Sequence, residues 1–239
     1  MRHYKYFISL CFFLTLFNCK EEQKITFSDI NITTNQNIIV EVNIPEANGN
    51  KMVSNQINSE IQKKIISDLH IGNPDTITST SVEESIASFN NEYTIFKTKF
   101  PETPLIWEAQ IDGEVMYNST KIISVAITAF SNTGGAHGIL NISFLNFDSN
   151  TGQRIQNNEL LKNTEAFKTL AKSYFENVTK DKNLLLDKDF KLPENMGYSE
   201  DGIVLLYNTY ELAAYSSNII EFAIPFEKAE PHLVFNSSY

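Results

Sequence analysis

Residues 105–130 read LIWEAQIDGEVMYNSTKIISVAITAF, and residues 139–147 read ILNISFLNF. Apolar and polar residues alternate through most of both stretches, which is the pattern of half-buried β-strands. We expect strands at 105–111, 115–117, 122–130 and 139–147, with Asp112-Gly113 and Asn118-Ser119 as turns or bulges. Successive strands with such short connections predict a meander.

Helical periodicity flanks these strands on both sides. Before them, apolar residues recur every four positions from Val53 to Leu69, and Ser81-Val82-Glu83-Glu84 has the Ser-x-x-Glu form of a capping box. After them, residues 164–178 show the most regular 3.6-residue periodicity in the chain, with Thr164 as the expected cap. We therefore predict helices at 52–69, at 82–93 and at 164–178.

Shorter strands complete the pattern. Residues 38–44 alternate at period two and stop at Pro45, residues 203–207 and 219–224 read as the last strands, and residues 226–234 suggest a short helix. Residues 180–198 are charged and irregular. The predicted fold class is α+β, with antiparallel sheets packed against a few helices in two sub-domains.

The first residues have the layout of a bacterial lipoprotein leader. Arg2 and Lys5 precede an apolar run from Phe7 to Phe17, which ends just before Cys19. As a helix this run extends about 16 Å, against about 30 Å for the hydrocarbon core of a membrane, so it is too short to span one. We expect cleavage after residue 18 and acylation of Cys19, as by palmitate, which would anchor the chain to a membrane of the cell envelope. The alternative is an ordinary secretory leader with an incidental cysteine.

Charge limits the classes of partner. Without residues 1–18 the chain keeps 17 basic and 29 acidic residues, a net charge of −12. Nucleic acid is an unfavourable partner for such a surface, whereas cationic proteins and peptides are attracted to it. The alternative is that the acidity only maintains solubility. Cys11 leaves with the leader, so no disulfide framework is expected.

No catalytic motif stands out. His70, His137 and His232 lack metal-site spacing, and the chain has no Gly-x-Ser-x-Gly elbow, phosphate-binding loop or dinucleotide fingerprint. We expect no metal, no cofactor and no nucleophilic residue. Two carboxylates that meet in a cleft, as in glycoside hydrolases, stay open as an alternative, since sequence alone does not show such a meeting.

Two groups of residues are candidates for ligand binding. Gly134 and Gly135 permit close backbone approach and would orient His137, although a structural turn is the commoner use of such a segment. Tyr207, Tyr210 and Tyr215 would anchor a glycan or a protein if exposed, and would otherwise pack in the core.

These segments also carry a family resemblance. SNTGGAHG at 131–138, FDSNTG at 147–152 and YNTYELAAY at 207–215 resemble the extracellular C-terminal domain of RsiV-type anti-sigma factors. The strand at 38–44 and the helix at 52–69 resemble the domain of unknown function that also accompanies the peptidoglycan deacetylase PdaC. The resemblance covers residues 35–235 and implies an α+β fold outside the cytoplasmic membrane. In the best understood member this region binds lysozyme.

We predict a signal peptide at 1–18, a tether at 19–34 that runs into an edge strand, a PdaC-type domain at 35–130 and an RsiV-type domain at 131–239. The sigma-binding segment and the deacetylase's catalytic domain are not recognised. We expect a lipid-anchored, non-enzymatic envelope module, on the periplasmic face or the cell surface, that binds a cationic protein such as lysozyme or a cell-wall glycan. The alternatives are an envelope polysaccharide hydrolase with paired carboxylates and a structural or assembly lipoprotein.

Overall fold

Two β-sheets, each with its own helices, form the part of the chain that the structure describes. The structure is a computed structural model, and it describes residues 24–180, 190–209, 211–212 and 219–236. The larger sheet has the strand order β1-β2-β3-β4-β5-β6, and the smaller has the order β7-β8-β9. The predicted α+β class with two sub-domains is confirmed.

The larger sheet contains one parallel pair of strands. Its strands are β1 (Thr26–Asn31), β2 (Val40–Asn48), β3 (Glu108–Asn118), β4 (Ile122–Asn132), β5 (Ile139–Asp148) and β6 (Arg154–Ile155). β2 and β3 are parallel, and all other neighbours are antiparallel. A parallel pair needs a long crossover, which helices α1 (Lys51–Leu69) and α2 (Val82–Lys99) supply. The sequence pattern predicted the meander β3–β5 but not this parallel pair.

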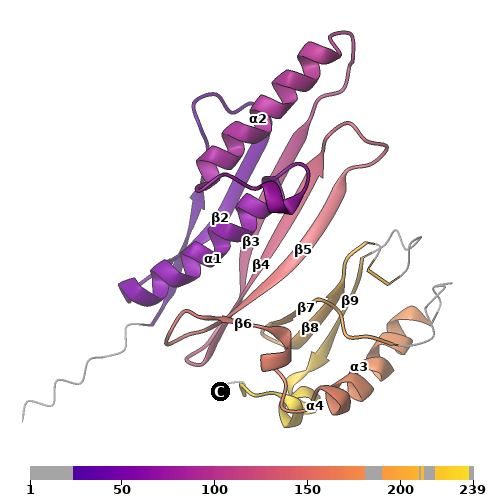
Figure 1. Ribbon diagram of the computed structural model, residues 1–239. Helices are drawn as coiled ribbons and strands as arrows, with labels where there is room; N and C mark the ends of the chain where they lie inside the picture. The colour runs from indigo at the N-terminus through magenta and orange to yellow at the C-terminus, as the bar shows by residue number, and fades with distance from the viewer. Residues whose placement is uncertain (1–23, 181–189, 210, 213–218, 237–239) are drawn as a thin grey trace, which may run out of the picture.

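Both helices lie across one face of the larger sheet (Figure 1). The predicted four-residue stripe of α1 is fully buried, and it packs against the apolar residues of β2, β3 and β4 in one core. The Ser81 side chain caps α2 by accepting a hydrogen bond from Glu84 N at 3.2 Å. The Glu84 carboxylate accepts a hydrogen bond from the backbone N–H of Thr80 at 2.6 Å. In the usual capping box the donor would be the N-cap residue itself, Ser81, so the observed donor lies one residue earlier.

The smaller sheet is covered on both faces. Its strands are β7 (Asn195–Tyr198), β8 (Gly202–Tyr207) and β9 (Ile220–Pro225), and its helices are α3 (Thr164–Thr179) and α4 (Phe226–Ala229). Ile203, Leu205 and Tyr207 share a core with α3, whereas Val204 and Leu206 pack against Phe144 of β5. Every residue of β8 is therefore buried. Short 3-10 turns occupy Pro74–Thr76, Asn157–Glu159 and Glu230–His232.

A buried polar cluster joins the two sheets. Ser124 of β4 and Asn146 of β5 are both inaccessible to solvent, and the Ser124 hydroxyl donates a hydrogen bond to Asn146 Oδ1. Asn146 Nδ2 donates to Met196 O at 2.8 Å, and Tyr198 N donates to Ser124 Oγ at 3.0 Å. Because Met196 and Tyr198 belong to β7, these hydrogen bonds fix how the smaller sheet lies on the larger one.

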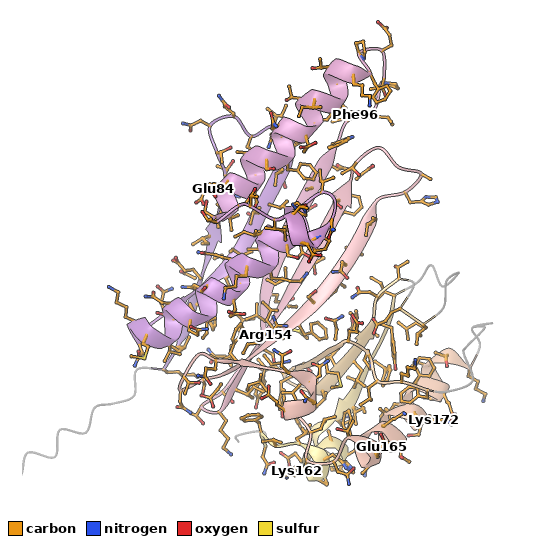
Figure 2. All side chains as sticks on the ribbon, in the orientation of Figure 1. Glu84, Phe96, Arg154, Lys162, Glu165 and Lys172 are labelled. Atoms are coloured by element: carbon orange, nitrogen blue, oxygen red, sulfur yellow. The ribbon has the colours of Figure 1, made fainter. Side chains whose placement is uncertain are left out.

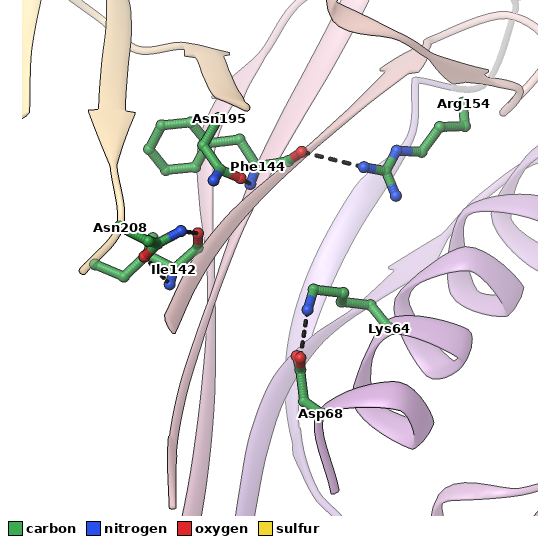
Figure 3. A network of polar contacts seen from close by, with 7 residues as sticks. All are labelled: Lys64, Asp68, Ile142, Phe144, Arg154, Asn195 and Asn208. Atoms are coloured by element: carbon green, nitrogen blue, oxygen red, sulfur yellow. Dashed lines mark hydrogen bonds and ion pairs between the residues drawn. The ribbon is translucent and has the colours of Figure 1, made fainter. Parts of the chain in front are cut away.

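Side chains also complete the outer edge of β5 (Figure 3). Asn208 accepts a hydrogen bond from Ile142 N at 2.9 Å and donates one to Ile142 O at 2.8 Å, as a neighbouring strand would. Asn195 accepts from Phe144 N at 3.2 Å, and Arg154 donates to Phe144 O at 3.4 Å. The β5 edge is thereby protected beyond the two residues that pair with β6.

Several element predictions need correction. β2 continues through Pro45 to Asn48, because its ladder with β3 ends at Asn43 and leaves the proline paired with β1 only. β3 runs straight through Asp112-Gly113. Asn163, not Thr164, caps α3 by accepting from Ala166 N at 3.0 Å. Strand β7 lies in the segment expected to be irregular. The expected boundary between residues 130 and 131 falls inside β4.

Candidate functional site

The face of β1, β2 and β3 that points away from the helices is acidic. Strands β1 to β5 contain seven Asp and Glu residues and no Lys or Arg. The pairing register places five of the seven on this one face, here called the acidic face: Asp29, Glu41, Glu108, Asp112 and Glu114. Carboxylates gathered without interspersed cations create a negative potential that attracts cationic partners.

Hydrogen bonds between side chains order the centre of the acidic face. Asn31 donates to Asn43 at 2.8 Å, and Asn43 donates to Asp112 at 3.4 Å. Gln110 donates to the other carboxylate oxygen of Asp112 at 2.8 Å. The chain of contacts crosses from β1 to β3, so these polar groups hold fixed positions before any partner arrives.

A groove of about 770 Å³ borders the acidic face where β2 and β3 begin. It is lined by residues 31–33, 37–41, 43, 106–110 and Phe130. Two carboxylates, Glu41 and Glu108, line the groove together with Ile106, a residue that is 68% exposed. An exposed apolar side chain within a charged surface is typical of a protein-binding region.

Aromatic residues form the rigid base of this region. Trp107 is buried, and its ring lies 5.1 Å from Phe96, 5.9 Å from Tyr93 and 6.0 Å from Phe89 of α2, measured between ring centres. Phe96 marks this end of α2 in Figure 2. Within the described residues the Trp107 indole nitrogen has no hydrogen-bond partner.

The glycine-rich segment forms the hairpin between β4 and β5 and contacts the same base. Gly134 has a φ of +84°, and a Cβ there would lie 3.3 Å from Trp107 Nε1. Its backbone conformation and this close approach both explain the glycine. Gly135 and His137 are exposed. The hairpin therefore serves as packing for Trp107 at Gly134, while the ligand role expected for His137 stays a prediction.

Tyr207 has a structural role in the core of the smaller sheet. Tyr207 is buried in β8, its ring lies 5.4 Å from Phe175, and its hydroxyl donates to Lys191 O at 2.6 Å. Burial raises the pKa of the Tyr207 phenol. Tyr207 thus packs in the core, which was the alternative to a ligand-binding role. Tyr210, Tyr215 and the lipidation candidate Cys19 lie outside the described residues.

Among the described residues, the carboxyls of Asp68 and Glu211 have raised pKa values, and each interacts with neighbours of its own. Burial raises the pKa of Asp68, and the ion pair with Lys64 only partly opposes this effect (Figure 3). Burial also raises the pKa of Glu211, whose oxygens accept hydrogen bonds from the backbone of Glu194 and Asn208. Asp68 lies on α1 and Glu211 follows β8, and neither carboxyl has the other among its hydrogen-bond, ion-pair or charge partners.

The raised pKa of Asp68 predicts a pH dependence of stability. The folded state holds the Asp68 proton more tightly than the unfolded state, so ionisation of Asp68 costs stability as pH rises above its ordinary pKa. We expect the unfolding free energy of Asp68→Asn, relative to that of the unmodified protein, to increase as the pH rises from about 4 to about 7. Urea titrations at several pH values measure this difference. Glu84→Gln is the control with the opposite sign, because hydrogen bonds from Thr80 lower the pKa of Glu84. Parallel curves for Asp68→Asn and the unmodified protein would contradict the assignment.

Sequence reasoning did not find the acidic face. Its signal was present in the outward positions of the alternating strands, which carry carboxylates and amides but no lysine or arginine. Recognition required the register, because only the pairing of β1, β2 and β3 brings these positions together. Among the residues that the structure describes, no three His, Cys, Asp or Glu side chains gather as a metal-binding group. None of the helices in the described ranges is both long and apolar enough to cross a bilayer.

The geometry defines a two-unit α+β protein with a pre-ordered acidic surface on its larger sheet. Comparison with protein families also divides the chain into two parts. Residues 32–140 match the family described as Deacetylase PdaC, and residues 150–227 match the family described as Protein of unknown function (DUF3298). The chain is therefore similar to a PdaC-type domain in its first part and to a DUF3298 domain in its second part.

Two solved structures share this fold. A DUF3298 family protein from Pseudomonas aeruginosa PAO1 is 16% identical, with a TM-score of 0.60 over 88% of this chain and 94% of that chain. A DUF3298 family member from Bacteroides fragilis NCTC 9343 is 18% identical, with a TM-score of 0.57 over 90% of this chain and 96% of that chain. At these identities the likeness concerns the fold alone. No curated protein matches the chain.

Proposed function

We propose that this chain is a lipid-anchored, non-enzymatic binding module of the bacterial cell envelope, and that its acidic face docks a cationic protein of the lysozyme type. The anchor in this proposal is the acylated Cys19, in the envelope location expected from the leader. The observation that carries the docking role is the charge of strands β1 to β5, which have no basic residue and place five carboxylates on one face.

The surface has the two parts that such docking needs. The carboxylates of the acidic face would speed the encounter with a cationic protein and fix its orientation. Ile106 and the groove beside it would supply the apolar contact that gives a complex its lifetime. The hydrogen-bonded order of Asp112 and its neighbours limits the entropy lost on binding.

Neutralisation of the acidic face tests the docking role. The variant carries Glu41→Gln, Glu108→Gln, Asp112→Asn and Glu114→Gln, and it is titrated with lysozyme by calorimetry at low and at physiological salt. Exposed charge pairs contribute a few tenths of a kcal/mol each, so loss of four predicts about a tenfold weaker affinity at low salt. The affinity of the unmodified protein should fall with added salt more steeply than that of the variant.

The matched control changes net charge equally at other places. The substitutions are Glu83→Gln, Glu92→Gln, Glu165→Gln and Glu176→Gln, at residues that are exposed on α2 and α3. This control should keep its lysozyme affinity within about threefold of the unmodified protein. Equal losses in both variants would show an effect of net charge alone, and absence of binding at high micromolar lysozyme would remove this partner.

A further inference from the structure

β1 is the outermost strand of the larger sheet, beside β2 (Figure 1). The two strands pair antiparallel without a register shift, and Ile32 continues that register by donating from its N–H to Val42 O at 3.0 Å. Backbone groups in an antiparallel ladder face the partner strand at every second residue, so the even-numbered residues of β1 bond to β2. The N–H and C=O groups of Phe27, Asp29 and Asn31 therefore face the open edge, and within the described residues they have no hydrogen-bond partner.

Side chains close other open strand edges of this protein, but not the edge of β1. Ala47 of β2 lies beyond the ladder with β3, and Asn58 of α1 accepts a hydrogen bond from Ala47 N at 2.7 Å and donates one to Ala47 O at 3.0 Å. Asn208 does the same for Ile142 of β5. The β1 sequence TFSDIN also has no lysine or proline, the residues that commonly prevent strand addition. β1 is therefore a strand to which an extended segment can add.

The side chains of β1 define the chemistry of such a segment. Asp29 and Asn31 are exposed and lie on the acidic face, whereas Ile30 packs against the core of the larger sheet. Residues directly opposite on an added strand would lie about 5 Å away, so basic residues suit the positions beside Asp29 and apolar residues suit the positions beside Ile30. A second copy of this chain fits poorly, because each copy has a net charge of −12 without residues 1–18 and brings its own Asp29.

We propose that the β1 edge binds an extended basic segment of a partner protein, which adds antiparallel to β1 as a further strand of the larger sheet. In this segment basic residues alternate with apolar residues. Backbone hydrogen bonds to Phe27, Asp29 and Asn31 supply the affinity, and the alternation supplies the specificity. This goes beyond the docking of a lysozyme-type protein, because it depends on the open backbone of β1 as well as on charge.

Three peptides test the pairing of the backbone with the full chain. The first alternates lysine and valine, the second is N-methylated at each lysine, and the third is N-methylated at each valine. Residues opposite Asp29 and Asn31 exchange hydrogen bonds with them in antiparallel addition, so the lysine N–H groups would face β1 and the valine N–H groups would face solvent. Calorimetry should show at least about tenfold weaker binding for the peptide with N-methylated lysines, and a change below about threefold for the other. All three peptides carry the same charge.

Two substitutions of Asp29 separate the backbone from the charge. Asp29→Asn removes the charge alone and should weaken the first peptide about twofold. Asp29→Pro also removes the N–H that faces the open edge and places a ring there, so it should weaken this peptide at least about tenfold more than Asp29→Asn does. Proline is accepted in an edge strand where its nitrogen faces solvent, and we expect both variants to unfold within a few degrees of each other. Should Asp29→Pro not fold, the N-methylated peptides still decide the result.

Each outcome supports or overturns strand addition at β1. Equal affinity for the three peptides, or loss with N-methylated valines instead, overturns antiparallel addition, as does an Asp29→Pro variant that binds like Asp29→Asn. No saturation by the first peptide up to about 1 mM also overturns it. A dimer in sedimentation velocity that Asp29→Pro dissociates would assign the edge to a second copy and overturn the basic partner.

The same variants separate this proposal from the docking role. The variant with a neutralised acidic face keeps the backbone of β1, so it should still distinguish the two N-methylated peptides after its lysozyme affinity has fallen. Asp29→Pro should bind lysozyme as Asp29→Asn does. Failure of lysozyme docking therefore leaves strand addition in place, and failure of strand addition leaves lysozyme docking in place.

Discussion

Asn146→Ala is expected to lower the free energy of unfolding by about 3 kcal/mol. Asn146 is only 1% exposed, and its amide group contacts both sheets. The substitution removes the acceptor of the Ser124 hydroxyl and the donor to Met196 O, and it leaves those two buried groups without their partner. The lost hydrogen bonds, the unpaired carbonyl and the small cavity act in the same direction.

Urea unfolding monitored by circular dichroism measures this loss. Asn91→Ala is the matched control, because Asn91 is exposed on α2, and its unfolding free energy should change by no more than about 0.5 kcal/mol. A separate early transition for the smaller sheet in Asn146→Ala would show that the cluster mainly joins the two units. A loss below about 1 kcal/mol would mean that the cluster contributes little to holding the sheets together.

Gly152→Ala is expected to cost a similar amount, about 3 kcal/mol, for a different reason. Gly152 ends the turn between β5 and β6 with a φ of +72°, a conformation that residues with a Cβ adopt at a cost. A Cβ would also lie 2.5 Å from Val53 O, in the first turns of α1. The clash is with a backbone atom, so no side-chain rotation relieves it. Either the turn or the helix must shift, and that shift loses packing.

The control for this prediction lies in the other glycine-containing hairpin. Gly135→Ala would place a Cβ 3.7 Å from its nearest neighbour, His137 O, at a position without positive φ. We expect its midpoint of thermal unfolding to match that of the unmodified protein, while Gly152→Ala unfolds several degrees lower. Similar midpoints for all three proteins would show that the β5–β6 turn moves away from α1 without cost.

Local patterns were sufficient to predict most elements. The apolar stripe of α1, the cap of α2 and the existence of strand β5 follow from residues close in sequence, and the structure confirms them. The pairing of β2 with β3 depends instead on contacts between residues about 70 positions apart, for which the strand sequences hold no local signal. Strand β7 was missed because it is four residues long, which is too short for an alternating pattern to be recognised in the sequence.

Tertiary contacts also overrode two local signals. Asp112-Gly113 is a common turn dipeptide, but Asp112 points to the acidic face and accepts side-chain hydrogen bonds there, while Gly113 lies against Pro45 of β2. Both residues therefore suit the middle of β3. Pro45 itself is compatible with β2 because the ladder with β3 has already ended.

The candidate site was less predictable than the fold. Sequence reasoning selected residues by type, namely a histidine among glycines and a group of tyrosines, and the structure places Tyr207 in a core and His137 on an exposed hairpin. The acidic face depends instead on which strand neighbours which. The position of a carboxylate in a single sequence does not show which strands are neighbours in the sheet.

The two hydrogen bonds between Asn208 and Ile142 bear on the order in which the protein matures. During synthesis the larger sheet emerges first, and its β5 edge stays bare until roughly 60 more residues have followed and delivered Asn208. Over that interval the nascent chain presents a strand to which another copy can add. A chaperone that held the chain unfolded until it was complete would remove this hazard, because Asn208 protects the β5 edge only after the whole sheet region has been made.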